Sequence, residues 1–236
     1  MIKAVLFDLD GTLLDRDTSV KKFVEDQHTR LSSVLSHIPK KIFAEKFIAL
    51  EQNGYVWKDK VYQKLAEELA VRRMPPGELL DDYLTNFKYH CTPFPNLLSM
   101  LGELKKKGLR LGLVTNGYGV FQNDSIKALE IKEYFDAILI SEMEGLSKPD
   151  PLIFERAAER LNVKTEECMF VGDHPKNDVE AAKNTGMLAV WKTSPYWDEA
   201  EAADYSITDL EELKLIIENE EKRQYNLQNK EKSTVM

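Results

Sequence analysis

Short apolar runs separated by amphipathic stretches recur along most of the chain. The clear runs lie at residues 3–9, 110–116, 136–141, 168–173 and 188–191, and a weaker one lies at 205–207. Between them, segments near 96–107, 119–130, 150–161 and 176–185 have helical spacing. Strands that alternate with helices in this way predict an α/β fold, with a doubly wound parallel sheet covered by helices on both faces.

The interval from about Asp17 to His90 breaks this alternation. Its pattern contains no strand signal, and apolar residues such as Val20, Phe23 and Val24 recur there at helical spacing. Further helices are expected where prolines and an Asn-Gly pair divide the interval, near 40–52, 57–72 and 76–89. The pattern therefore predicts a small α-helical domain inserted after the first strand.

These patterns give the expected domain boundaries. The core is expected over 1–16 and 92–220, the inserted helical domain over 17–91, and a polar tail over 221–236. Two connections that run side by side between the domains predict a hinge. The tail is polar enough to be a fraying helix end or a disordered segment.

Composition and charge exclude several classes of protein. With 236 residues and 43% hydrophobic content, the chain can bury a sizeable core. Its formal net charge of -8 argues against nucleic acid or an anionic membrane as a partner, because both require a basic face. The first residues are too few for a signal-peptide core, and no apolar run reaches about 18 residues. We therefore expect a soluble cytoplasmic protein, and the sequence favours no particular oligomeric state.

Polar residues close several of the predicted strands. Ligands of doubly wound sheets bind beyond the carboxyl ends of the strands, so the residues at these ends are candidates for a site. The candidates are Asp8, Asp10, Thr115, Asn116, Ser141 and Asp173.

Asp8 and Asp10 stand two positions apart in the stretch FDLDGTL. In strand geometry their side chains would lie on one face, about 6 to 7 Å apart, and would repel each other. Gly11 permits a tight turn that lets a backbone carbonyl face the same point as the carboxylates. All-oxygen ligation of this kind suits Mg²⁺, and the four histidines form no cluster with the cysteines. A divalent cation is therefore expected to neutralise the pair.

The stretch LVTNGYG offers groups suited to an anion. The Thr115 hydroxyl, the Asn116 amide and the backbone of Gly117 stand at a predicted strand-to-helix turn. Backbone N–H groups at such a helix N-terminus favour negative charge. The turn therefore predicts half of a phosphate site.

Two later stretches complete the expected site. Lys148, in SKPDP, stands just before a proline that starts a helix, where its position is fixed. The stretch VGDHPKND ends its strand with Asp173 and places Asp178 at the start of the next helix. We expect acids and one lysine to converge on one edge of the sheet.

These four motifs, FDLDGTL, LVTNG, SKPDP and VGDHPKND, occur in an order and at distances typical of a known family. The chain resembles the haloacid dehalogenase-like (HAD) hydrolase superfamily, in the branch that carries a helical cap after the first motif. The resemblance spans residues 3 to about 210. It implies a Rossmann-like core and a hydrolase that acts on phosphate monoesters.

The resemblance also implies a role for each acid. Asp8 would be the nucleophile that forms an aspartyl-phosphate, and Asp10 would be the general acid and base. Mg²⁺ would be held by the carboxylates of Asp8 and Asp173 and by the backbone carbonyl of Asp10. Asp178 would lie behind this set and orient a metal-bound water or Lys148.

The remaining motif residues are implied to hold the transferring phosphoryl group. Thr115 and Lys148 would bind it and neutralise its charge in the transition state. Asn116 and the backbone of Gly117 would complete the phosphate site.

Other activities of the same architecture differ in their residues. Haloacid dehalogenases lack the second aspartate of the first motif, so Asp10 argues against that reaction. Phosphonatases and phosphotransferases or mutases of the β-phosphoglucomutase type keep the core motifs and remain alternatives to the phosphatase. A receiver-like signalling domain with a phosphorylated aspartate is about half as long and has no inserted domain. A dinucleotide-binding module requires a G-x-G-x-x-G turn, and DLDGTL stands in its place.

The substrate is expected to be a small phosphorylated metabolite. In this family the cap covers the core and supplies the pocket for the leaving group. The break between cap helices at 51–58 is expected to lie over the catalytic edge, with Gly54, Tyr55 and Trp57 as specificity residues. Aromatic side chains there would favour nucleoside monophosphates, ahead of phosphoglycolate and sugar phosphates.

Overall fold

The computed structural model describes residues 1–234, with side chains described up to residue 226. The chain divides into a core unit, formed by Met1–Leu14 and the chain from Pro93 onward, and a helical unit, Asp15–Thr92. The helical unit is inserted between the first and second strands of the core unit.

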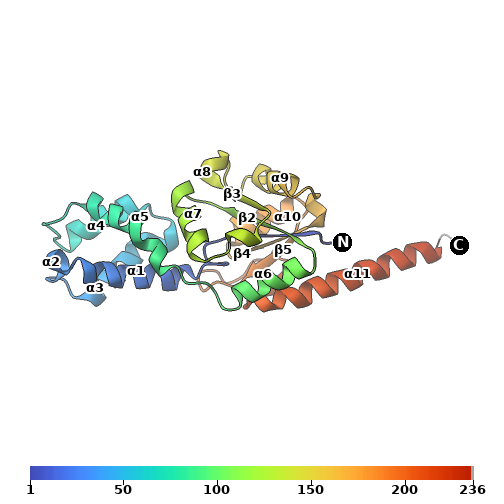
Figure 1. The fold of residues 1–236 in the computed structure, drawn as a ribbon, viewed down its shortest axis with the longest axis horizontal. Helices are drawn as coiled ribbons and strands as arrows, with labels where there is room; N and C mark the ends of the chain where they lie inside the picture. Colours follow the sequence, from blue (N-terminus) through green and yellow to red (C-terminus); the bar gives the residue numbers. More distant parts are fainter. Residues whose placement is uncertain (235–236) are drawn as a thin grey trace. The chain divides into compact units, whose positions relative to one another are not determined.

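The core unit is built on a six-stranded, wholly parallel sheet with the strand order β3-β2-β1-β4-β5-β6 (Figure 1). The strands are β1 (Ala4–Phe7), β2 (Arg110–Thr115), β3 (Ala137–Ile140), β4 (Cys168–Gly172), β5 (Leu188–Lys192) and β6 (Tyr205–Ile207). The order reverses between β1 and β4, which lie at the centre of the sheet. These observations confirm the predicted doubly wound α/β fold.

Helices cover both faces of this sheet. They are α6 (Leu97–Lys106), α7 (Gly119–Ala128), α8 (Ser141–Glu144), α9 (Pro151–Arg160), α10 (Ala181–Asn184) and α11 (Leu213–Thr234). In Figure 1, α6 and α11 lie on one side of the sheet, and α9 and α10 lie on the other. A π-helix over Pro175–Glu180 precedes α10, so the helix predicted at 176–185 begins with a wider turn. Helix α11 continues into the predicted tail at 221–236, whose residues 235 and 236 lie outside the described part.

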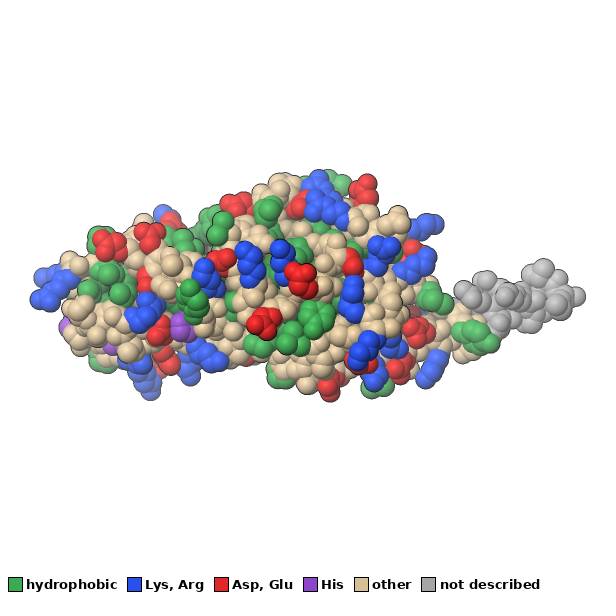
Figure 2. Space-filling model, in the orientation of Figure 1, with side chains coloured by type: hydrophobic (Ala, Val, Ile, Leu, Met, Phe, Trp, Pro, Cys, Tyr) green, Lys and Arg blue, Asp and Glu red, His purple; other side chains and the backbone are tan. Residues whose placement is uncertain are grey.

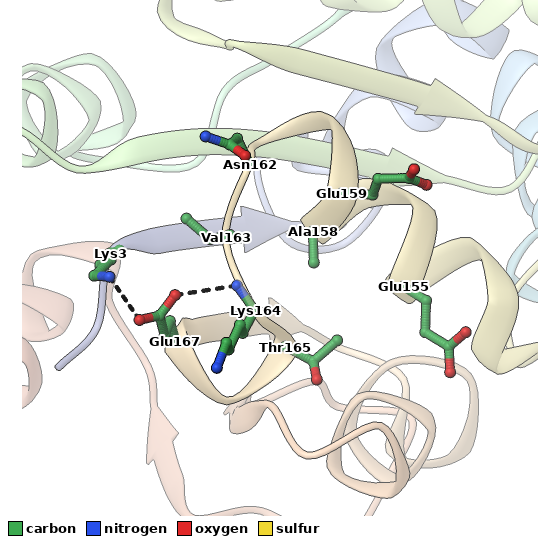
Figure 3. Close-up of a pocket in the computed structure, with 9 residues that line it drawn as sticks. All are labelled: Lys3, Glu155, Ala158, Glu159, Asn162, Val163, Lys164, Thr165 and Glu167. Carbon is green, nitrogen blue, oxygen red and sulfur yellow. Dashed lines mark hydrogen bonds and ion pairs between the residues drawn. The ribbon is translucent and has the colours of Figure 1, made fainter.

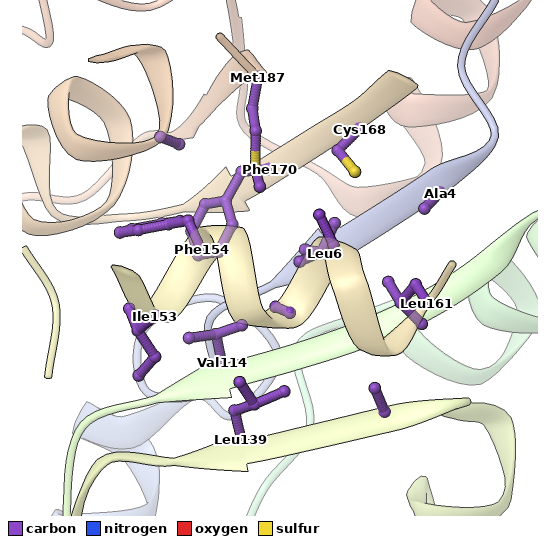
Figure 4. Packing of buried hydrophobic residues seen from close by; sticks show 14 of the residues in the cluster. Ala4, Leu6, Val114, Leu139, Ile153, Phe154, Leu161, Cys168, Phe170 and Met187 are labelled. Carbon is purple, nitrogen blue, oxygen red and sulfur yellow. The ribbon is translucent and has the colours of Figure 1, made fainter. Parts of the chain in front are cut away.

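Strand β1 is buried throughout, because helices pack on both of its faces. Ala4 and Leu6 pack with Phe154 of α9 and with Leu161, which directly follows this helix (Figure 4). Gly112 of β2 makes room for this contact, since a Cβ atom there would lie 3.0 Å from Leu6 Cγ and 3.1 Å from Leu161 Cδ1. The central strands are thereby held firmly, and the residues that follow them are fixed in position.

The helical unit is a separate bundle around an aromatic core. It contains α1 (Arg16–Arg30), α2 (Ser32–Leu35), α3 (Lys40–Glu51), α4 (Lys58–Glu68) and α5 (Pro76–Asn86). Phe23 packs edge-to-face on Tyr83, with ring centroids 5.0 Å apart. Gln27 is buried beside them and satisfied, since it donates to the Leu79 carbonyl at 3.0 Å and accepts from the Tyr62 hydroxyl at 2.8 Å.

The surface carries charge of both signs. Lys and Arg side chains are interspersed with Asp and Glu side chains on the face shown in Figure 2. Among the described residues, no helix is both long enough and apolar enough to cross a membrane.

Candidate active site

Two carboxylates meet at the carboxyl edge of the central strands. Asp8 follows β1 and Asp173 follows β4, and the pairing of Phe7 with Val171 brings these neighbouring strands to the same level. The Asp8 N–H donates to the Val171 carbonyl at 2.9 Å, which extends the ladder by one residue. Oxygen atoms of Asp8, Asp173 and Asp178 all lie within 4.8 Å of one another. The predicted convergence of these acids is therefore present in the structure.

Two glycines make this convergence possible. Gly11 has a φ of 84°, and a Cβ atom there would lie 2.5 Å from an Asp173 carboxylate oxygen. Gly172 lies so close to Asp178 that an added Cβ would be 2.4 Å from the Asp178 Cβ. Any larger residue at either position would push a carboxylate away from the cluster.

Lys148 supplies a positive charge inside the acidic cluster. Its Nζ atom lies 2.5 Å from Asp8 Oδ1 and 2.6 Å from Asp178 Oδ1, and all three side chains are buried. Burial works against the charged ammonium, but Asp178 and Asp8 outweigh burial and raise the Lys148 pKa above its ordinary value. The lysine is therefore a fixed cation at neutral pH.

If Asp8, Asp173 and Asp178 were all ionised, they would carry more negative charge than Lys148 balances. Burial raises the pKa of Asp8 to about 7, with Asp178 and Asp10 adding to the effect and Lys148 opposing it. Burial, followed by the charges of Asp8 and Asp178, raises the pKa of Asp173 to about 8. Clustered hard oxygen donors with unbalanced charge are the donor set that Mg²⁺ prefers. The residues present therefore fit this cation.

The π-helix after β4 positions Asp178. Wider turns of this kind often occur at functional sites, where they move a side chain out of α-helical register. The backbone N–H of His174 donates to Asp178 Oδ2 at 3.0 Å, while Lys148 occupies Oδ1. His174 Nδ1 in turn accepts the N–H groups of Lys176 and Asn177 at 3.1 and 3.2 Å, which caps the π-helix. Asp178 therefore pairs with Lys148, and its expected role in orienting that lysine stays a prediction.

Asp10 is held by a residue that sequence reasoning missed. Gln122, in α7, donates from Nε2 to Asp10 Oδ2 at 2.8 Å and to the Thr115 hydroxyl at 2.7 Å. The same nitrogen lies 3.2 Å from the Asn116 carbonyl oxygen. A glutamine on an amphipathic helix has no distinctive sequence signal. The one available clue is that Gln122 stands seven residues after Thr115, in the first turn of the helix that follows β2.

The other residues of the LVTNG motif make specific contacts. The Asn116 side chain donates to the Lys148 carbonyl at 2.8 Å and accepts the Lys148 N–H at 2.9 Å. The Gly117 N–H donates to the Ser141 hydroxyl at 2.9 Å. Asn116 and Gly117 thus tie this turn to the loop that carries Lys148 and to the end of β3.

The predicted specificity residues belong to the helical unit. Gln52, Asn53 and Gly54 all have positive φ and turn the chain between α3 and α4. Tyr55 and Trp57 follow this turn, with 57% and 59% of their surfaces exposed. Their role in specificity stays a prediction.

A hollow of about 540 Å³ lies at the opposite edge of the sheet (Figure 3). Lys3 and Glu167, which precede β1 and β4, form an ion pair across part of it at 2.6 Å. Glu167 also accepts the Lys164 N–H at 3.1 Å. These contacts pair Lys3 with Glu167 and fix Glu167 to the turn that precedes β4.

A doubly wound α/β core with clustered acids and a buried lysine beyond its central strands defines the class of protein. The family comparison agrees with it, because the model of the haloacid dehalogenase-like hydrolases matches residues 5–192. The chain belongs to the haloacid dehalogenase-like hydrolase family, as its four motifs predicted.

Relatives with assigned activities cover most of the chain. A glyceraldehyde 3-phosphate phosphatase from Pyrococcus furiosus is 32% identical over 93% of this chain and 94% of that protein. The pyrimidine 5'-nucleotidase YjjG from Escherichia coli is 28% identical over 66% of this chain and 69% of that protein. The crystal structure of a HAD phosphatase from Thermococcus onnurineus has a TM-score of 0.66 at 31% identity, and covers 92% of this chain and 98% of that chain.

Proposed function

We propose that this protein is a Mg²⁺-dependent phosphatase that hydrolyses monoesters of small phosphorylated metabolites through an aspartyl-phosphate on Asp8. The observation that carries the proposal is the buried Asp8 carboxylate, held 2.5 Å from Lys148 Nζ beside Asp173 and Asp178. The phosphatase names of relatives that match nearly the whole chain support the reaction class.

The metal set proposed from the motifs is the Asp8 and Asp173 carboxylates and the Asp10 backbone carbonyl, with Asp178 close to both carboxylates. A bound Mg²⁺ would supply positive charge to the phosphoryl oxygens and to the clustered acids. The oxygen-only chemistry of the cluster and its unbalanced charge support this assignment.

In the first half-reaction, Asp8 is the nucleophile. One of its carboxylate oxygens forms a bond to phosphorus while the bond from phosphorus to the ester oxygen breaks. Asp10 donates its proton to that oxygen, so the leaving group departs as a neutral alcohol and Asp10 becomes a carboxylate. The product on the enzyme is a phosphoryl group on Asp8.

In the second half-reaction, the Asp10 carboxylate takes a proton from water as the water oxygen bonds to phosphorus. The bond from phosphorus to the Asp8 oxygen breaks, which frees the Asp8 carboxylate and inorganic phosphate. Asp10 is protonated again and the cycle closes.

Several groups bear the charge of the transferring phosphoryl group. Lys148 lies beside the nucleophilic oxygen, and the Thr115 hydroxyl stands at the end of the neighbouring strand β2. The Asn116 side chain acts indirectly, because its two hydrogen bonds to the Lys148 backbone hold that lysine in position.

The substrate class is drawn from the relatives and from the helical unit. Relatives named for glyceraldehyde 3-phosphate and for pyrimidine nucleotides both act on small monoesters. We propose that Gly54, Tyr55 and Trp57 select the leaving group, with nucleoside monophosphates, triose phosphates, phosphoglycolate and sugar phosphates as the panel to test.

The proposal is tested by phosphate release from p-nitrophenyl phosphate and from this panel. Turnover should require Mg²⁺, stop on addition of EDTA and be abolished in Asp8→Asn. Acid-quenched wild-type protein should carry a hydroxylamine-sensitive phosphate on the peptide that contains Asp8. Asp81→Asn, an exposed aspartate of α5, is the matched control and should keep full turnover.

Two outcomes would overturn the proposal. Turnover that is unaffected by removal of all metal would exclude the metal site. A phosphoryl group that persists on Asp8 without release of inorganic phosphate would instead indicate signalling, and transfer to a second sugar phosphate would indicate a mutase.

A further inference from the structure

Gln122 contacts both Asp10, the proposed general acid, and Thr115, a proposed phosphate-binding residue. It is buried, with 2% of its surface exposed, and its Nε2 lies 2.8 Å from Asp10 Oδ2 and 2.7 Å from Thr115 Oγ1. Asp10 and Thr115 come from different strand ends and are far apart in the sequence. One amide group therefore connects the proposed general acid with the proposed phosphate-binding hydroxyl.

Chemistry fixes which end of the Gln122 amide faces these groups. A carboxylate and a backbone carbonyl can only accept hydrogen bonds, and Nε2 faces both Asp10 Oδ2 and the Asn116 carbonyl oxygen. Turning the amide over would place its oxygen against these oxygens. The NH₂ end must therefore point into the site.

The backbone around Gln122 is shaped to admit its side chain. A Cβ atom at Gly117 would lie 2.9 Å from Gln122 Cγ and 3.0 Å from Gln122 Cδ. Gly117 also has a φ of 152°, which few other residues adopt. The glycine of the LVTNG motif thus leaves the space that Gln122 fills.

When one oxygen of a carboxyl group accepts a hydrogen bond from an N–H group, the other oxygen is the more favourable site for a proton. Because Gln122 donates to Asp10 Oδ2, and a protonated oxygen is the poorer acceptor, this contact favours the transferable proton on Oδ1. The Thr115 oxygen likewise uses a lone pair on Gln122, which leaves its own hydrogen to donate elsewhere. Gln122 therefore sets the direction of both donors.

We infer that Gln122 is a positioning residue that directs the Asp10 proton to Oδ1, toward the leaving group, and the Thr115 hydroxyl hydrogen toward the phosphoryl group. This inference rests on the proposed phosphatase function. It assigns to α7 a part in leaving-group protonation.

The test compares two substrates that differ in their need for an acid. p-Nitrophenol is a stable anion and leaves with little protonation, whereas an alkyl alcohol requires a proton. Gln122→Met keeps the length of the side chain and removes the donor. Its kcat/KM should fall by about 10- to 100-fold more for the best alkyl monoester of the panel than for p-nitrophenyl phosphate, as expected when general acid catalysis is impaired.

The ratio of the two kcat/KM values does not depend on how much of the variant is folded, because both are measured on one preparation. Asn123→Leu, which removes an amide from the next position of α7, is the matched control and should leave the ratio unchanged. An equal loss for both substrates in Gln122→Met would overturn the inference. Absence of Mg²⁺-dependent turnover in the wild type would instead overturn the proposed function itself.

Discussion

Asn116 and Lys148 are joined by two reciprocal hydrogen bonds, in which the Asn116 side chain donates to the Lys148 carbonyl and accepts its N–H. The distances are 2.8 and 2.9 Å, so the amide uses both of its ends on one peptide backbone. The loop that carries Lys148 is thereby fixed to the end of β2, and its ammonium group is directed at Asp8.

The first prediction follows from this clamp. Asn116→Leu keeps the volume but leaves the Lys148 N–H and carbonyl without these partners, and each such group costs about 1–3 kcal/mol when buried. Because Asn116 is exposed, water can partly replace its amide, so we expect the free energy of unfolding to fall by about 1–3 kcal/mol in total and kcat to fall with it. Urea unfolding and p-nitrophenyl phosphate turnover measure both effects, with Asn123→Leu as the control. Unchanged kcat would show that Asn116 does not align Lys148.

The second prediction concerns Lys148 itself. Lys148→Met leaves the buried carboxylates of Asp8 and Asp178 facing each other without a cation. Removal of one partner from a buried ion pair typically costs about 3–5 kcal/mol, so the metal-free variant should unfold at much lower urea concentration. Turnover should be lost even with Mg²⁺ present. Lys176→Met, at an exposed position of the neighbouring π-helix, should change neither quantity measurably.

The sequence was sufficient to predict the strands and the convergence of acids at their carboxyl ends. Strands buried on both faces, such as β1, must be continuously apolar, and their ends are then marked by polar residues such as Asp8 and Asp173. Because parallel strands share one carboxyl edge, the order of motifs along the chain placed these acids together. The inserted helical unit was visible because the strand signal stops there.

The contacts between side chains could not be predicted in the same way. The π-helix at Pro175–Glu180 leaves no trace in the hydrophobic period, since it shifts register by only one residue. Gln27 interrupted an apolar pattern, yet it lies buried because Tyr62 and Leu79 satisfy its amide. Gln122 was missed for the same reason, since its partners come from segments distant in the sequence.

A third prediction concerns the close approach of Gly172 to Asp178. A Cβ atom at Gly172 would lie 2.4 to 2.6 Å from three atoms of the Asp178 side chain, so Gly172→Ala must displace that carboxylate. Such overpacking costs about 1–3 kcal/mol, and Mg²⁺ affinity should fall as Asp178 moves. Urea unfolding and calorimetric titration with Mg²⁺ measure the two effects.

Gly102 provides the matched control for this substitution. It lies within α6, and an added Cβ would meet no atom within 4 Å. Gly102→Ala should therefore stabilise the protein by about 0.4–1 kcal/mol and leave Mg²⁺ affinity unchanged. If Gly172→Ala behaved like Gly102→Ala, the close approach of Gly172 to Asp178 would be wrong.

The last prediction links pH, metal and stability. In the unfolded chain Asp8 and Asp173 ionise near their ordinary pKa of 3.8, whereas burial raises their pKa in the folded protein to about 7 and about 8. At pH values between the unfolded-state and the folded-state pKa, the folded protein binds more protons than the unfolded chain. Its free energy of unfolding must therefore fall as pH rises. In EDTA, the urea midpoint should therefore be higher at about pH 5 than at about pH 8.5.

Mg²⁺ should reverse this trend, because it binds the folded state in competition with those protons. Stabilisation by a fixed excess of Mg²⁺ should be small at about pH 5, where the cluster is protonated, and should grow toward about pH 8.5. Asp173→Asn removes one of the two raised groups, so its urea midpoint in EDTA should depend less on pH than that of the wild type. Equal slopes in the two proteins would mean that Asp173 does not hold its proton in the folded state, and that its negative charge is already balanced without a metal.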